Sequence, residues 1–152
     1  MPTNAIIIRT SWMYSEFGNN FVKTMLRLGK ELNELNVVSD QIGSPTYATD
    51  LAGVILHIIK TKEFKEVSQA TQIYHYSNKG EVSWYAFAKE IFKIPEINCE
   101  VSPITTQQYL VPAKRPKNTS INKDKITKIF DIETVDWKEA LRTCITISKK
   151  KI

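Results

Sequence analysis

The sequence predicts an α/β fold, because short apolar stretches with the composition of strands alternate with longer stretches of helical periodicity. Two of the expected strands, at 5–12 and 72–77, are rich in isoleucine or tyrosine and nearly free of charge. That composition is typical of strands buried on both faces of a sheet. The 152 residues suffice for one ordinary domain, and neither a repeat nor a break in composition divides them.

Each expected element is delimited by residues that start or stop regular structure. Asn20 and Ser83 can cap helices with their side-chain oxygens. Gly43 and Pro45 interrupt the chain between a strand and a helix, and Pro95 ends a helix. The expected elements in order are a strand at 5–12, a helix over 21–32, a strand at 35–40, a loop over 41–47, a helix over 48–61, a strand at 72–77, a helix over 84–94, an extended segment over 99–117, and helices near 122–130 and 137–148.

Composition and charge argue against several kinds of protein. The net charge is +5, but the basic residues are spread along the chain without a nucleic-acid-binding motif, so we expect no nucleic acid as a partner. No apolar run approaches the roughly 20 residues that cross a membrane, so we expect no membrane partner. Cys99 and Cys144 are far apart, which favours reduced thiols in a cytoplasmic protein. Two isolated histidines and this cysteine spacing predict no metal site.

Common enzyme signatures are absent from the sequence. Five glycines cannot assemble either a G-x-G-x-x-G turn or a P-loop. Tyr85 and Lys89 have the Y-x-x-x-K spacing of short-chain dehydrogenases, in which a lysine one turn away lowers the pKa of a tyrosine proton donor. The neighbouring aromatic residues favour an ordinary amphipathic helix with Tyr85 at its polar border. We therefore predict no catalytic residue in this pair.

Three segments remain as candidates for a binding site. The first is a polar and aromatic cluster at the carboxyl end of the first strand, where open α/β sheets bind ligands. The second is the loop D-Q-I-G-S-P-T over 40–46, in which Gln41 can both donate and accept hydrogen bonds. The third is Arg115, whose backbone is held extended by Pro116 and whose guanidinium suits a diphosphate.

Structural roles would also explain these segments. The 40–46 loop could be a capped turn in which Ser44 or Thr46 caps the following helix. Arg115 could be an ordinary surface arginine. From the residues alone, both alternatives stay open.

The three segments occur together in an order that resembles one family. R-T-S-W-M-Y over 9–14 precedes N-N-F over 19–21, D-Q-I-G-S-P-T-Y-A-T-D-L-A over 40–52, S-W-Y-A-F-A over 83–88 and R-P-K-N-T-S over 115–120. This arrangement resembles the C-terminal half of the dTDP-4-dehydrorhamnose reductases, which are extended short-chain dehydrogenases/reductases. The resemblance runs from about Ala5 to Leu141.

The resemblance implies a fold and an origin for the chain. The fold would be the C-terminal portion of an NAD(P)-binding Rossmann-like protein with a mostly helical substrate-binding region. Residues 1–152 would be a single C-terminal fragment, with late sheet strands near 5–12 and 72–77. The N-terminal half, which in the family carries the cofactor-binding turn and the catalytic Y-x-x-x-K, would be absent. No catalytic residue is therefore expected in this chain.

The resemblance also implies a reaction. The intact enzyme would use NADPH or NADH to reduce dTDP-4-dehydro-6-deoxy-L-mannose to dTDP-L-rhamnose, for cell-surface polysaccharide biosynthesis. Neither cofactor is expected to bind tightly to this chain, which is expected to be inactive alone. Alternatives are a non-catalytic binding or regulatory protein on the same scaffold, or another nucleotide-sugar enzyme such as an epimerase. We also expect self-association through exposed sheet edges.

Carried over residue by residue, the resemblance implies a set of substrate contacts. Trp12 would pack on the deoxysugar, because an indole offers an apolar face and one donor. Arg115 would contact the diphosphate. The other substrate-binding candidates are Arg9, Thr10, Ser11 and Tyr14 at the same strand end, and Asn20, Phe21 and Gln41 on the nucleotide-sugar side.

Overall fold

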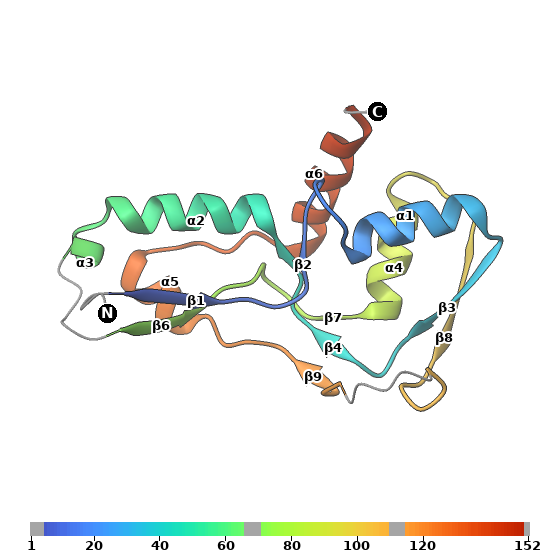
Figure 1. The fold of residues 1–152 in the computed structure, drawn as a ribbon, viewed down its shortest axis with the longest axis horizontal. Coiled ribbons are helices and arrows are strands. Elements are labelled where there is room, and N and C mark those ends of the chain that lie inside the picture. The colour runs from blue at the N-terminus through green and yellow to red at the C-terminus, as the bar shows by residue number, and fades with distance from the viewer. Residues whose placement is uncertain (1–4, 66–70, 110–114, 151–152) are drawn as a thin grey trace.

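The computed structural model describes residues 5–65, 71–109 and 115–150, and these form an elongated α/β structure (Figure 1). One end holds β1, β6, α2 and α5, and the other holds α1, α4, β3 and β8. The elements in chain order are β1 (Ile6–Arg9), β2 (Met13–Tyr14), α1 (Phe21–Glu31), β3 (Glu34–Val38), β4 (Ile42–Gly43), β5 (Thr46–Tyr47), α2 (Ala48–Lys60), α3 (Lys62–Lys65), β6 (Gln72–His75), β7 (Val82–Ser83), α4 (Trp84–Lys93), β8 (Glu100–Ile104), β9 (Asn118–Thr119), α5 (Asp124–Phe130) and α6 (Trp137–Lys150).

The two predicted strands of the sheet, β1 and β6, pair with each other in parallel. Ile6 and Ile8 pack against a core formed by α2, α5 and β6. Ile7 and Ile73 are partners in the register, and they are 46% and 40% exposed. The prediction that both strands are buried on both faces is therefore wrong for this chain: one face packs on helices and the other is open to solvent.

The first strand is shorter than predicted. β1 ends at Arg9, and Trp12 has a φ of 46°, in the left-handed region. A left-handed residue ends an extended strand because it turns the backbone. The chain then continues as β2, which pairs in parallel with β5.

The larger core lies among α1, α4 and α6. Gly29 of α1 lies against the ring of Phe92 on α4, and a Cβ at Gly29 would stand 2.7 Å from the Phe92 Cε1. The glycine thus allows the two helices to approach closely. The other buried apolar residues of this core include Val22, Met25, Phe87, Ile91, Leu141, Cys144 and Ile145.

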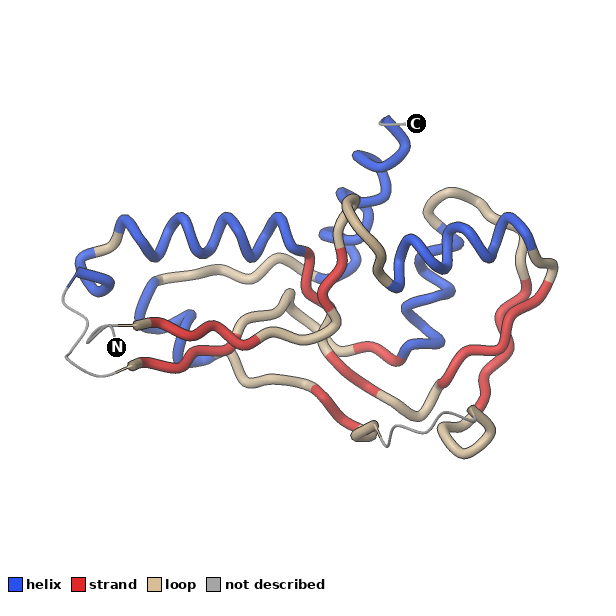
Figure 2. The backbone as a smooth tube through the Cα atoms, viewed as in Figure 1, coloured by secondary structure: helices blue, strands red, loops and turns tan. Residues whose placement is uncertain are grey.

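Several short strands lie where the sequence predicted loops, as the tube in Figure 2 shows. The predicted loop at 41–47 contains β4 and β5, and β4 lies between β7 and β9 in a small sheet. The predicted extended segment contains β8, which pairs in parallel with β3. A two-residue strand is too short to show an alternating pattern in the sequence.

The predicted helix starts are mostly confirmed. The Asn20 side chain accepts a hydrogen bond from the Lys23 N–H, and the Ser83 hydroxyl accepts one from the Ala86 N–H. At the start of α2, by contrast, no side chain caps the helix. The proposal that Ser44 or Thr46 caps it is therefore wrong.

Candidate functional site

Two adjoining cavities form one candidate site, named here the Trp12 groove. The smaller cavity, of about 180 Å³, and the larger, of about 350 Å³, share Gln41, Trp84 and Arg115 as lining residues. The smaller is also lined by Trp12, Pro116 and Thr119, and the larger by Phe21, Met25, Asn36, Val37, Val38 and Tyr109. Of the nine sequence-predicted contacts, Trp12, Phe21, Gln41 and Arg115 thus meet at one place.

An aromatic platform dominates the groove. The indole rings of Trp12 and Trp84 are stacked, with their centroids 3.5 Å apart and an angle of 10° between their planes. Phe21 lies against the same Trp84, with 4.5 Å between ring centroids. Aromatic faces of this kind bind flat bases and the C–H faces of sugars.

The backbone around Trp12 is held by the 40–46 loop. The Thr46 N–H donates to the Trp12 carbonyl oxygen at 3.2 Å. Gly43 lies against the indole, because a Cβ at this position would stand 2.6 Å from Trp12 Cε2. The loop thus fixes the left-handed backbone and the ring position together.

Thr10 and Ser11 join the strand end to the same loop. The Thr10 hydroxyl donates to Thr46 Oγ1 at 2.7 Å, and the Ser11 hydroxyl donates to the Ser44 carbonyl oxygen at 2.7 Å. Neither lines the Trp12 groove. Their hydrogen bonds position the loop.

Gln41 and Asp40 anchor the other side of the loop to Thr106. Gln41 is 5% exposed, and its Nε2 donates to Thr106 Oγ1 at 3.1 Å. Asp40 Oδ1 accepts from both the hydroxyl and the N–H of Thr106, at 2.7 and 2.8 Å. The hydroxyl hydrogen bond lowers the pKa of Asp40, because it stabilises the carboxylate.

Tyr14, Asn20 and Arg9 lie outside the groove. Tyr14 is 2% exposed and packs against Tyr47 and Phe87, and burial raises the pKa of its phenol. The Asn20 side chain is occupied as the cap of α1. Arg9 is exposed at the end of β1. The geometry therefore does not bring these three predicted contacts to the groove.

Arg115 supplies positive charge to both cavities. Within the described ranges, no carboxylate lies within ion-pair distance of its guanidinium. An anionic group in the groove could therefore pair with it without competing with a protein carboxylate.

Sequence reasoning missed eight of the twelve residues that line the groove, and the polar or aromatic ones among them are Asn36, Trp84, Tyr109 and Thr119. Trp84 is the first residue of α4, where the helical pattern made it look like one more apolar helix residue. The signal that could have found it is its place directly after the cap Ser83, at the end of the helix that faces the groove.

The Y-x-x-x-K pair is not part of the groove. The Lys89 ammonium lies over the Tyr85 ring, 5.4 Å from its centroid, and neither residue lines either cavity. This placement agrees with the interpretation of α4 as an ordinary amphipathic helix.

Two other features bear on the kind of site. In the described part of the chain, no three His, Cys, Asp or Glu residues are grouped in a way that could hold a metal ion. None of the described helices combines the length and the apolar character that crossing a membrane needs. The described residues that line the candidate site supply aromatic rings, aliphatic side chains, amides, a hydroxyl and one guanidinium.

Comparison with known proteins gives consistent matches. The family model described as RmlD substrate binding domain matches residues 2–150. The dTDP-4-dehydrorhamnose reductase of Aggregatibacter actinomycetemcomitans is 45% identical over 148 residues, which are 93% of this chain and 50% of that protein. A crystal structure of the dTDP-4-dehydrorhamnose reductase of Clostridium acetobutylicum matches with a TM-score of 0.84 and 41% identity, covering 95% of this chain and 49% of that one.

A third match is the dTDP-4-dehydrorhamnose reductase of Bacillus anthracis in complex with NADP, with a TM-score of 0.82 and 40% identity. It covers 93% of this chain and 48% of that one. The chain thus spans about half the length of the relatives it matches. These structures confirm the predicted fold class, and the match over residues 2–150 confirms the resemblance drawn from the sequence motifs. The chain belongs to the RmlD substrate binding domain family.

Proposed function

We propose that this chain is the substrate-binding part of a dTDP-4-dehydrorhamnose reductase, and that the Trp12 groove holds the dTDP-linked deoxyhexose. The intact protein would reduce dTDP-4-dehydro-6-deoxy-L-mannose to dTDP-L-rhamnose. The observation that carries the proposal is the stacked pair of Trp12 and Trp84 beside the guanidinium of Arg115, which has no carboxylate partner among the described residues. Apolar rings next to a cation suit a ligand that joins a deoxysugar or base to a diphosphate.

The two cavities suit the two ends of such a ligand. The smaller cavity presents Trp12 to a deoxysugar, whose methyl group and C–H bonds can pack on an indole. The larger cavity presents Phe21 and Tyr109 to a planar base, with Asn36 as an amide for its polar edge. Arg115 lines both cavities, which is the position that a diphosphate between sugar and base requires.

The residues of this chain do not provide for the hydride donor. NADPH or NADH would supply the hydride in the intact protein, but the five glycines here stand at 18, 29, 43, 53 and 80. That spacing cannot form the glycine-rich turn that binds a dinucleotide pyrophosphate. We therefore assign this chain binding and orientation of the sugar nucleotide only, without a catalytic residue and without tight cofactor binding.

The same proposal places residues 1–152 in the C-terminal part of the intact reductase. In that arrangement, the open faces of β1 and β6 would pack against the preceding half of the protein. Ile7 and Ile73 are register partners and are both exposed, which supports this placement. Neighbouring apolar residues on an exposed sheet face are typical of a surface that another part of a protein covers.

Calorimetric titration of the chain with dTDP-L-rhamnose, dTDP and NADPH tests the proposal. We expect saturable binding of dTDP-L-rhamnose, weaker binding of dTDP and no saturable binding of NADPH. Trp12→Ala should weaken the binding of dTDP-L-rhamnose more than the binding of dTDP, because it removes the contact with the sugar. Arg115→Gln should weaken both, whereas the control Arg142→Gln, on an exposed position of α6, should weaken neither.

Two other outcomes of the titration would refute the proposal. Equal affinity for dTDP and dTDP-L-rhamnose, both unchanged by Trp12→Ala, would refute the groove as the sugar site. No binding of either nucleotide to a folded chain would refute an independent substrate-binding part. It would favour the alternative of a scaffold that binds a partner protein.

A further inference from the structure

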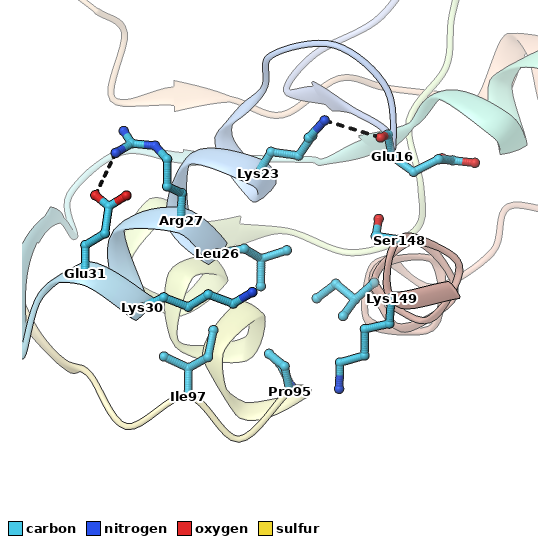
Figure 3. Close-up of a pocket in the computed structure, with 11 residues that line it drawn as sticks. Glu16, Lys23, Leu26, Arg27, Lys30, Glu31, Pro95, Ile97, Ser148 and Lys149 are labelled. Carbon is cyan, nitrogen blue, oxygen red and sulfur yellow. Dashed lines mark hydrogen bonds and ion pairs between the residues drawn. The ribbon is translucent and has the colours of Figure 1, made fainter. Parts of the chain in front are cut away.

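A second groove lies on the other side of α1, between α1, the segment after α4, and α6 (Figure 3). Its volume is about 480 Å³. Helix α1 separates it from the candidate substrate site, because Phe21 and Met25 line the Trp12 groove while Leu26 and Lys30 line this one. The second groove is named here the α1–α6 groove, and the proposed function makes no use of it.

The interior of the α1–α6 groove is apolar. Leu26 comes from α1, Pro95 and Ile97 come from the segment after α4, and Ile145 comes from α6. Ile145 is fully buried and belongs to the larger core, so the groove reaches down to that core. A hydrocarbon or aromatic group fits such a surface, because its transfer from water to apolar surroundings is favourable.

The rim of the groove is basic. Four cationic and two anionic side chains line it. Arg27 is paired with Glu31 at 2.7 Å, and the Lys23 ammonium donates to the Glu16 carbonyl oxygen at 3.5 Å. The Glu16 carboxylate in turn accepts a hydrogen bond from the Tyr47 hydroxyl.

Two ammonium groups on the rim form no ion pair with a carboxylate of the described residues. Lys30 on α1 and Lys149 on α6 have no carboxylate within ion-pair distance in the parts of the chain that the structure describes. They stand on opposite walls of the groove, with the apolar residues between and beside them (Figure 3). Two like charges at one opening repel each other, and an anion placed there would be attracted to both.

We propose that the α1–α6 groove binds a small amphipathic anion, with an acyl chain or aromatic ring against Leu26, Ile97 and Ile145 and a carboxylate or phosphate at Lys30 and Lys149. The volume lies within the range of roughly 300–1,000 Å³ that is usual for small-molecule sites. Of the two helices that form its walls, α1 lies at the end of the molecule away from β1 and β6, and α6 lies near the middle (Figure 1).

The test is an NMR titration of the whole ¹⁵N-labelled chain with four probes. Octanoate and octyl phosphate carry both the apolar body and the charge, octanol carries only the body, and acetate carries only the charge. We expect saturable shifts of amides in α1, α6 and residues 95–97 with octanoate, octyl phosphate or both, at lower concentration than with octanol or acetate. Which of the two anions binds more tightly distinguishes a carboxylate from a phosphate ligand.

A charge variant shows whether the lysines are responsible. Lys30→Gln combined with Lys149→Gln should lower the affinity for the more tightly bound anion about three- to tenfold. This is the effect expected from the loss of two exposed ion pairs. The matched control, Lys60→Gln combined with Lys128→Gln, alters two exposed helix lysines elsewhere and should leave the affinity unchanged. Affinity for octanol equal to that for the anions, an unchanged affinity in the Lys30 and Lys149 variant, or no saturable binding of either anion would overturn the proposal.

Discussion

The ring of Trp84 lies flat on the ring of Trp12, with 3.5 Å between centroids and 10° between planes. Trp12 sits in the turn after β1 and Trp84 begins α4, so the stack joins the strand end to the helix that closes the larger core. One face of the Trp12 indole is therefore already occupied. A ligand in the groove can therefore contact only the part of the Trp12 indole that Trp84 leaves uncovered.

Loss of Trp84 should weaken substrate binding through Trp12. Trp84→Ala removes the stacking partner, which is worth about 0.5–1.5 kcal/mol, so we expect the affinity for dTDP-L-rhamnose to fall about two- to tenfold. Trp84→Phe keeps a ring at the position and should cost less. Calorimetry measures both affinities, and circular dichroism checks that both variants fold. Unchanged affinity in a folded Trp84→Ala variant would show that the stack does not support the site.

Gly43 should be intolerant of even a methyl group. A Cβ at Gly43 would stand 2.5 Å from Thr119 Oγ1 and 2.6 Å from Trp12 Cε2, so Gly43→Ala must displace the indole or β9. We expect a loss of about 1–3 kcal/mol in unfolding free energy, together with weaker substrate binding. The control is Gly53→Ala in α2, where nothing lies within 4 Å. It should stabilise the chain by about 0.5–1 kcal/mol in urea unfolding.

The sequence identified the parts of the site that lie in loops. Trp12 and Gln41 follow strands, and Arg115 precedes Pro116, so each lies where a polar or aromatic residue has no role in a periodic pattern and therefore stands out. Trp84 did not stand out, because it occupies the first turn of an amphipathic helix. Tyr14 was misplaced for the opposite reason: it follows the strand end in sequence, but β2 turns it into the core.

The short strands escaped prediction for a physical reason. β2, β4, β5, β7 and β9 each contain two residues, and their pairing depends on partners far away in the sequence. The longer helices, in contrast, carry local signals in their caps and their apolar spacing. Local signals can be read from one segment, whereas a two-residue ladder exists only after the chain has folded.

Asn78 should be one of the most sensitive polar residues. It is fully buried, and its Oδ1 accepts from the Tyr47 N–H at 2.7 Å while its Nδ2 donates to Asp50 Oδ2 at 2.6 Å. Asn78→Ala leaves buried groups without partners, and we expect it to lower the unfolding free energy by about 2–4 kcal/mol. The control Asn33→Ala, at an exposed position, should change it by less than about 0.5 kcal/mol. Urea denaturation measures both, and equal losses would contradict the prediction.

Asp40 should make the stability of the chain depend on pH in the acidic range. The Thr106 hydroxyl lowers its pKa in the folded chain below the ordinary value of 3.8. The folded state thus binds the proton less readily than the unfolded state. The contribution of Asp40 to the stability of the folded chain is complete above pH 3.8. It is lost as the pH falls through the lower pKa of the folded state.

The variant Asp40→Asn isolates this effect, because its amide does not titrate. We expect the urea midpoint of the native chain to fall more steeply than that of Asp40→Asn as the pH is lowered from about 5 to about 2. Thr106→Val removes the hydroxyl donor and should reduce the steepness toward that of Asp40→Asn. Parallel midpoints for all three proteins across this range would show that the hydrogen bond does not set the pH response.

The chain alone should self-associate through its apolar surface at the end that holds β1, β6 and α2. Ile7 and Ile73 are exposed on the strands, and Ile55, Leu56 and Ile59 are exposed on α2, with Leu56 at 60%. Each of β1 and β6 also has one edge without a strand partner among the described residues. Exposed apolar groups and open strand edges both promote association.

Two substitutions show whether this surface is responsible for the association or whether any exposed apolar residue has the same effect. Leu56→Lys places a charge within the exposed apolar surface of α2, and we expect it to raise the dissociation constant of self-association about tenfold in sedimentation velocity. Leu32→Lys changes a similarly exposed leucine at the far end of α1 and should have no such effect. Hydrogen exchange reports on the strands: amides of β1 should be protected more strongly at high protein concentration, because association shields them. A monodisperse monomer whose β1 amides are already well protected would contradict the prediction, since a strand with an open edge would then be stable without a partner.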